Sequence, residues 1–166
     1  MTAVESFAAA GGPVVGICNG FQILTEAGLL PGALQKNSGL KFICADVSLR
    51  VRTTRSPITS LMTVDEVVRI PISHFEGNYT VDSDTLAEMW ADERVVLTYE
   101  DNPNGSVDSI AAVCNPGRNV VGLMPHPERA SHPLLGGTDG AALLRSLLAT
   151  AAGTSPTAVG ATPANG

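Results

Sequence analysis

The segment Gly16–Gly20, which reads Gly-Ile-Cys-Asn-Gly, constrains the fold of this chain more than any other. It follows directly on the apolar run Pro13–Val15 and opens into a helical pattern over residues 21–28. A nucleophile between two flanking glycines is typical of a sharp turn from a buried strand into a helix. Glycine lets the backbone crowd together at such a turn while the middle side chain stays exposed. The segment therefore predicts a strand, a tight elbow with Cys18 at its tip, and a helix.

This placement at a helix N-terminus predicts a reactive Cys18. Unpaired amides and the helix dipole favour the thiolate, which is the form of cysteine that attacks carbon. The alternative is that Cys18 is a small buried apolar residue, as most single cysteines are. The five residues alone leave both interpretations open.

The bulk composition predicts one globular domain. A chain of 166 residues with 44% hydrophobic and 16% charged residues can bury a core. The net charge of −6, with only ten Lys and Arg residues, disfavours a nucleic-acid surface. We expect the domain to occupy residues 1–150 and a disordered tail to occupy 151–166, because the tail has no charge and few large apolar side chains.

The cysteines indicate a reducing environment. Cys18, Cys44 and Cys114 form no Cys-x-x-Cys pair, and the histidines lie far from them in the sequence, so neither a disulfide framework nor a metal site is predicted. Cys44 and Cys114 are interpreted as no more than small apolar filler. The chain has no secretory signal and no run of 18 apolar residues, so we expect no membrane partner and a cytoplasmic location.

The middle of the chain is predicted to be rich in strands. Alternating apolar and polar residues over 40–52 indicate a half-exposed strand, and Pro71 places the strand over 66–73 at a sheet edge or a strand end. Met89 and Trp90 are interpreted as core residues of a short helix capped by Asp82 or Ser83. Further strands are expected over 94–99, 106–114 and 120–124, and a final helix with a stripe of Leu143, Leu144, Leu147 and Leu148.

His126 supplies the second half of a candidate site. It follows the expected strand 120–124 and is flanked by Pro125 and Pro127. Because open α/β sheets gather functional groups at the carboxyl ends of their strands, this imidazole can face the elbow cysteine. Glu128 can accept a hydrogen bond from the imidazole Nδ1–H and fix the tautomer. Cys18, His126 and Glu128 therefore form a candidate triad, whereas His132 has no such setting and His74 suits either a pocket wall or an ordinary turn.

Three stretches of the chain carry a family resemblance. Gly16-Ile-Cys-Asn-Gly-Phe-Gln22, Glu26-Ala-Gly-Leu-Leu-Pro-Gly32 and Gly122-Leu-Met-Pro-His-Pro-Glu128 together resemble the class I glutamine amidotransferases. The similarity spans about residues 13–148. It implies an α/β fold of the flavodoxin-like kind, a doubly wound mixed sheet.

The resemblance also implies roles for individual residues. Cys18 would be the nucleophile, His126 the general base and Glu128 the residue that orients the imidazole. The backbone N–H of Asn19 would stabilise the oxyanion. Other positions that match the neighbourhood of the bound glutamine are Gln22, His74 and Phe75, although the family usually has glycine where this chain has Phe75.

The implied activity is hydrolysis of L-glutamine to glutamate and ammonia. Within the family the match is strongest to glutaminase subunits of purine biosynthesis, which pass ammonia to a large synthetase subunit that acts on formylglycinamide ribonucleotide, together with a small third subunit. ATP and Mg²⁺ would belong to that synthetase partner, and no cofactor is expected in this chain, which has no Gly-x-x-x-x-Gly-Lys-Ser/Thr motif.

The chain departs from the family before the elbow. Family members resemble sheets whose opening strands and a glycine-rich oxyanion loop precede the elbow, whereas only twelve residues precede Pro13 here. We therefore expect an amidotransferase domain that lacks its N-terminal strands. Two alternatives stay open: a weakly active or inert fragment that retains only partner docking, and another thiol hydrolase or protease with the same triad.

Overall fold

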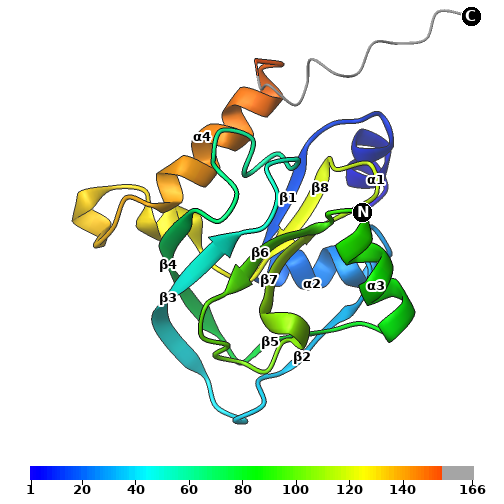
Figure 1. The fold of residues 1–166 in the computed structure, drawn as a ribbon. Coiled ribbons are helices and arrows are strands. Elements are labelled where there is room, and N and C mark those ends of the chain that lie inside the picture. The colour runs from blue at the N-terminus through cyan, green and yellow to red at the C-terminus, as the bar shows by residue number, and fades with distance from the viewer. Residues whose placement is uncertain (155–166) are drawn as a thin grey trace, which may run out of the picture.

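The computed structural model describes residues 1–154, so residues 155–166 of the tail predicted over 151–166 lie outside the described residues. Figure 1 shows the arrangement of the elements. The helices are α1 (Thr2–Ala9), α2 (Asn19–Glu26), α3 (Ser83–Ala91) and α4 (Gly140–Ala151), with short 3₁₀ turns η1 (Val107–Ser109), η2 (Pro127–Ala130) and η3 (Pro133–Leu135). The strands are β1 (Val14–Ile17), β2 (Ala33–Lys36), β3 (Ile43–Val51), β4 (Val67–His74), β5 (Glu76–Thr80), β6 (Val95–Tyr99), β7 (Ile110–Cys114) and β8 (Val120–Leu123).

A six-stranded mixed sheet forms the centre of the molecule, in the order β1-β8-β7-β6-β3-β4. β1 and β8 are parallel, with Gly16 opposite Gly122, and the remaining neighbours are antiparallel. A separate antiparallel pair joins β2 to β5, and the sequence patterns did not predict it. The fold is therefore the mixed α/β fold that the sequence predicts.

Helices cover both faces of this sheet (Figure 1). On one face α4 contributes Leu143, which is fully buried in one hydrophobic cluster with side chains of β3, β4, β6, β7 and β8. On the other face Phe21 of α2 and Met89 of α3 are fully buried, and Phe21 stacks on Tyr79 with ring centroids 5.6 Å apart. The core role predicted for Met89 is confirmed, whereas Trp90 is half-buried and its indole N–H donates to the Asp108 carboxylate.

Two local expectations were wrong. The strand predicted to begin at Ser106 starts only at Ile110, because η1 precedes it and Asp108 and Ser109 have positive φ angles of 48° and 57°. The leucine stripe of the last helix is narrower than predicted, since Leu148 is 69% exposed. The buried face of α4 centres on Leu143 instead.

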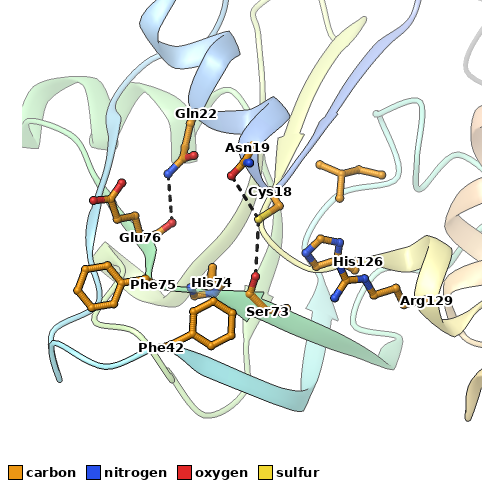
Figure 2. A pocket seen from close by; sticks show the side chains of 11 residues that line it. Cys18, Asn19, Gln22, Phe42, Ser73, His74, Phe75, Glu76, His126 and Arg129 are labelled. Carbon is orange, nitrogen blue, oxygen red and sulfur yellow. Dashed lines mark hydrogen bonds between the residues drawn. The ribbon is translucent and has the colours of Figure 1, made fainter.

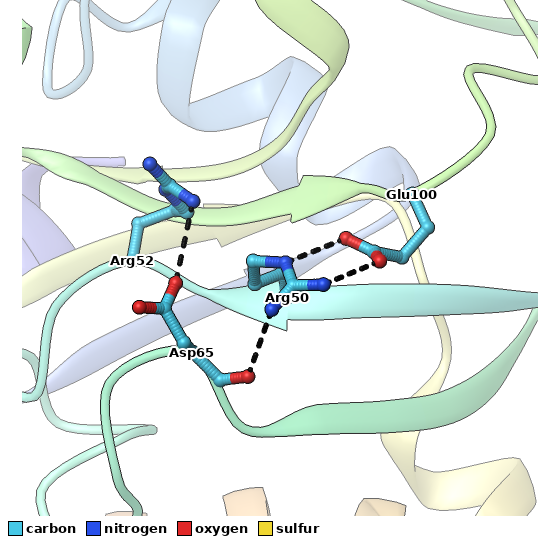
Figure 3. A network of polar contacts seen from close by, with 4 residues as sticks. All are labelled: Arg50, Arg52, Asp65 and Glu100. Carbon is cyan, nitrogen blue, oxygen red and sulfur yellow. Dashed lines mark hydrogen bonds and ion pairs between the residues drawn. The ribbon is translucent and has the colours of Figure 1, made fainter.

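The alternation predicted for β3 is confirmed at its end, where Val51 is buried and Arg50 is partly exposed. Figure 3 shows the polar contacts of Arg50. The Arg50 guanidinium donates two hydrogen bonds to the Glu100 carboxylate, at 2.8 and 2.6 Å. It also donates to the main-chain oxygen of Asp65, whose carboxylate pairs with Arg52 at 3.5 Å. These contacts fasten β3 to the segment after β6 and to the connection before β4.

Pro71 lies within β4, an edge strand, as the sequence predicts. The edge is occupied by other groups: the backbone N–H of Arg69 donates to the Asp139 carboxylate, and the carbonyl of Pro71 accepts from the backbone N–H of His126 at 2.8 Å. This last bond positions the residues after β8. None of the helices among residues 1–154 is long and apolar enough to cross a membrane.

Candidate active site

Cys18 sits at a strained turn between β1 and α2. Its φ of 52° and ψ of −107° lie in a region that non-glycine residues rarely adopt, and its backbone N–H donates to the carbonyl of Leu123 at 2.8 Å. A Cβ on Gly16 would lie 2.6 Å from backbone atoms of Gly20, so the first motif glycine is required by close approach. A Cβ on Gly20 itself would meet nothing within 4 Å, so the predicted crowding involves only one side of the elbow.

Cys18 was expected to favour the thiolate, but its surroundings favour the neutral thiol. Burial raises the pKa of the thiol above its ordinary value, and this outweighs the lowering by the backbone N–H of Asn19 and by the Arg129 guanidinium. The Glu128 carboxylate raises the pKa further. Cys18 is therefore a neutral thiol at neutral pH and needs a base to lose its proton.

His126 and Glu128 form the pair predicted from the sequence. The His126 ring is buried, and its Nδ1 lies 2.6 Å from Oε1 of Glu128. The carboxylate fixes Nδ1 as the protonated nitrogen, which leaves Nε2 with a lone pair. The same Oε1 is 3.7 Å from Nε of Arg129. Nε2 of His126 is buried and has no hydrogen-bond partner among the described residues.

Cys18 and His126 line one cavity of about 490 Å³. Figure 2 shows His126 and Arg129 on one side of the sulfur and His74, Phe75 and Glu76 on the other. The thiol does not point at the imidazole: the acceptors within reach of its one hydrogen are the carbonyl of Ser73 at 3.9 Å and Oδ1 of Asn19 at 4.0 Å. The triad residues are thus gathered around one pocket, with the His–Glu contact formed and the Cys–His contact not formed.

The wall opposite His126 comes from the end of β4 and the start of β5. Gln22, which α2 projects toward this wall, donates from Nε2 to the carbonyl of Glu76 at 3.4 Å. Phe75 is 37% exposed and has a negative φ, so its backbone does not require the glycine that the family usually has there. The predicted residues Gln22, His74 and Phe75 therefore all line the pocket.

His74 is a buried, neutral imidazole on this wall. Burial lowers its pKa from the ordinary value to about 4, and the neighbouring His126 contributes to the lowering. A Cβ on Gly77 would lie 2.2 Å from the ring, so glycine at that position leaves room for the imidazole. Nδ1 of His74 lies 3.0 Å from Oδ1 of the buried Asn37.

Sequence reasoning missed several lining residues. Ser73 contributes a main-chain carbonyl, for which a sequence carries no signal. Phe42 lines the pocket from the start of the β3 segment, where the alternating pattern gave no reason to single it out. Arg129 stands beside Glu128 in the motif already identified, and a basic residue next to the orienting carboxylate could have been noticed there.

Comparisons with known proteins identify the family of the chain. A family model described as a CobB/CobQ-like glutamine amidotransferase domain matches residues 1–136. Curated relatives include "Phosphoribosylformylglycinamidine synthase subunit PurQ" of Alkaliphilus metalliredigens, 58% identical over 148 residues, and that of Koribacter versatilis, 54% identical over 157 residues. Each alignment covers 89% of this chain, and 66% and 68% of the respective relative. The chain therefore spans about two thirds of the length of these relatives.

Solved structures show the same fold. The structure of PurLQS from Thermotoga maritima matches with a TM-score of 0.81 and 45% identity, over 89% of this chain and 66% of that chain. The glutaminase domain of Trypanosoma brucei CTPS with bound acivicin matches with a TM-score of 0.55 at 16% identity, covering 87% of this chain and 63% of that one. The second match concerns the fold alone.

Proposed function

The chain belongs to the glutamine amidotransferase family, and we propose from this premise that it is the glutaminase component of a phosphoribosylformylglycinamidine synthase. The reaction is hydrolysis of L-glutamine to glutamate and ammonia. One observation carries the proposal: a strained elbow cysteine lines the same pocket as a buried His126 that is hydrogen-bonded to Glu128, in a chain 58% identical to a relative named as a subunit of that synthase.

The raised pKa of the Cys18 thiol fits a mechanism with an explicit base. Nε2 of His126 carries the lone pair, because Glu128 holds the proton on Nδ1. For proton transfer the thiol turns away from the carbonyl of Ser73 toward Nε2. The thiolate then attacks the side-chain carbonyl carbon of glutamine, and the imidazolium of His126 gives its proton to the departing nitrogen as ammonia leaves.

Hydrolysis completes the cycle. Water attacks the glutamyl thioester at Cys18, His126 takes a proton from that water, and glutamate leaves as the thiol is restored. The backbone N–H of Asn19, the first residue of α2, points at the sulfur region and is the oxyanion donor available in this chain. Gln22, His74 and Phe75 form the wall that we assign to the rest of the substrate.

The ammonia is passed to a partner. We propose that a large synthetase subunit, with ATP and Mg²⁺ bound to that subunit, converts formylglycinamide ribonucleotide to formylglycinamidine ribonucleotide, together with a small third subunit. The match to the structure named PurLQS supports an assembly. Phe42, which is 61% exposed, and Phe75 both line the pocket, and we assign these exposed apolar side chains to contact with such a partner.

We propose a cytoplasmic location, which the free thiols of Cys18, Cys44 and Cys114 support, since free thiols persist in a reducing compartment.

Ammonia release from glutamine tests the proposal, measured for these 166 residues with and without the synthetase. We expect release that the synthetase increases, and its loss by about 10⁴-fold or more in Cys18→Ala. Binding to the synthetase without any release would favour the inert docking fragment. Cleavage of peptide substrates with no release of ammonia would favour a thiol protease. Release at the unaltered rate by the Cys18→Ala variant would remove Cys18 from the mechanism.

A further inference from the structure

A buried asparagine behind the pocket wall has a role that the triad does not explain. Asn37 is fully buried, in the loop between β2 and β3. Its backbone N–H donates to the carbonyl of Phe75 at 2.9 Å, and its Nδ2 donates to the carbonyl of His74 at 3.0 Å. Nδ2 also donates to the carbonyl of Lys41 at 2.8 Å. Asn37 thus holds two consecutive residues of the pocket wall without lining the pocket itself.

These contacts fix which way the Asn37 amide faces. Two main-chain carbonyls surround Nδ2, and a carbonyl accepts hydrogen bonds and cannot donate them. The reversed amide would bring Oδ1 against both carbonyl oxygens and leave them without donors in a buried place. Oδ1 therefore faces Nδ1 of His74, 3.0 Å away.

The orientation of the amide in turn fixes the state of His74. Oδ1 can only accept, so Nδ1 of His74 must carry the proton. The imidazole is neutral at neutral pH, because burial lowers its pKa to about 4. Nε2 then carries a lone pair, and it is buried with no hydrogen-bond partner among the described residues. A buried acceptor of this kind calls for an N–H or O–H donor.

We propose that Asn37 is a positioning residue for the substrate pocket. Asn37 holds His74 as the Nδ1–H tautomer, so that Nε2 of His74 accepts a hydrogen bond from an N–H group of the substrate. The identity of the ligand rests on the proposed glutaminase function; the tautomer does not. Glutamine carries two N–H groups that fit, its α-ammonium and its carboxamide. An imidazole with the proton on Nε2 would instead present a donor to the same groups and repel them.

The tautomer can be measured directly by NMR on chain labelled with ¹⁵N-histidine, which contains only His74, His126 and His132. Long-range ¹H–¹⁵N correlations distinguish a protonated from an unprotonated ring nitrogen, and His74→Gln assigns the signal. We expect His74 with Nδ1 protonated and Nε2 unprotonated at pH 7. A His74 signal with the proton on Nε2, or with both nitrogens protonated, overturns the proposal without any measurement of activity.

Variants test the positioning role. Asn37→Ala should shift the His74 signal toward the Nε2–H form and raise KM for glutamine roughly tenfold, with a smaller change in kcat, since one hydrogen bond to the substrate is affected. Ser146→Ala is the matched control: Ser146 is a fully buried hydrogen-bonding side chain on α4, away from the pocket, and its loss should alter stability while leaving KM and the His74 signal unchanged. An unchanged KM and His74 signal in folded Asn37→Ala contradict the proposal.

A pair of substitutions at His74 tests the acceptor itself. The amide oxygen of His74→Gln can reach the position of Nε2, whereas His74→Phe keeps a ring of similar size without an acceptor. We expect KM for glutamine to rise more in His74→Phe than in His74→Gln. Equal KM values in both variants overturn the acceptor role. If unaltered chain releases no ammonia even with the synthetase, the proposed function and the ligand assignment fall, whereas the NMR result still decides the tautomer.

Discussion

The two walls of the pocket are built by different physical means. The wall that carries Cys18 and His126 follows two paired parallel strands, β8, whose side chains are all buried, and β1, whose apolar side chains are partly buried. The wall that carries His74 and Phe75 belongs to the β4–β5 corner and is held by side-chain amides such as that of Asn37. Packing and local backbone shape position the reactive groups, and a buried polar network positions the wall opposite them. The first arrangement is visible in a sequence motif and the second is not.

Among substitutions that affect the wall with Cys18 and His126, Glu128→Gln has the largest expected effect. The substituted amide can turn its NH₂ group toward Nδ1 of His126 and so favour the wrong tautomer, with Nε2 protonated and unable to act as a base. We expect kcat for ammonia release to fall by about 10²-fold or more while the fold is retained. Steady-state kinetics together with circular dichroism check this, and Glu76→Gln, a carboxylate at the pocket that does not contact His126, is the control. Unchanged kcat in Glu128→Gln would contradict the orienting role.

Gly16 and Gly20, the two glycines of the elbow motif, allow a second test, which concerns the packing behind the elbow. Gly16→Ala places a Cβ 2.5 Å from Leu24 and 2.6 Å from the backbone of Gly20, so we expect a loss of about 2–3 kcal/mol in the free energy of unfolding. Gly20→Ala meets open space within α2 and should be neutral or stabilising by up to about 1 kcal/mol. Urea denaturation of the two variants measures the difference. Equal stabilities would show that the close approach at Gly16 is absent.

The smallest expected effect is on the pH dependence of stability, and it concerns His74 on the wall formed by the β4–β5 corner. The folded-state pKa of His74 is lowered from the ordinary value of 6.5 to about 4. At a pH between these two values, the unfolded chain binds a proton that the folded chain does not. Stability should therefore decline as the pH falls through this window. Urea denaturation at pH 7 and pH 5 should show a smaller decline for His74→Gln than for unaltered chain. His132→Gln, at an exposed position outside the pocket, serves as the control. The same decline in all three would exclude His74 as its source.

The sequence predicts the parts of this molecule that depend on local pattern. The elbow at Cys18, the His126–Glu128 pair and most strands follow from apolar runs, glycines and prolines, which act over a few residues. The raised pKa of Cys18 was not foreseen, because the degree of burial depends on what the rest of the chain places around the sulfur. The helix N-terminus favours the thiolate as expected, but burial has the larger effect.

Other features could not be predicted because distant segments create them. Asn37 and His74 are 37 positions apart, and nothing in either neighbourhood indicates that their side chains meet. The β2–β5 pair is equally non-local. The contact between Cys18 and the carbonyl of Ser73 involves a main-chain atom, which every residue has.

The central claim, that Cys18 is the nucleophile of a glutamine-hydrolysing site, is tested most directly by labelling with an electrophilic glutamine analogue and locating the adduct by mass spectrometry. Cys44 is the internal control, since it is exposed whereas Cys18 is partly buried with a raised pKa. A general alkylating reagent should therefore modify Cys44 faster than Cys18. The glutamine analogue is predicted to modify Cys18, with free glutamine protecting it, and to leave Cys44 unmodified. An adduct on Cys44 with Cys18 intact would contradict the account.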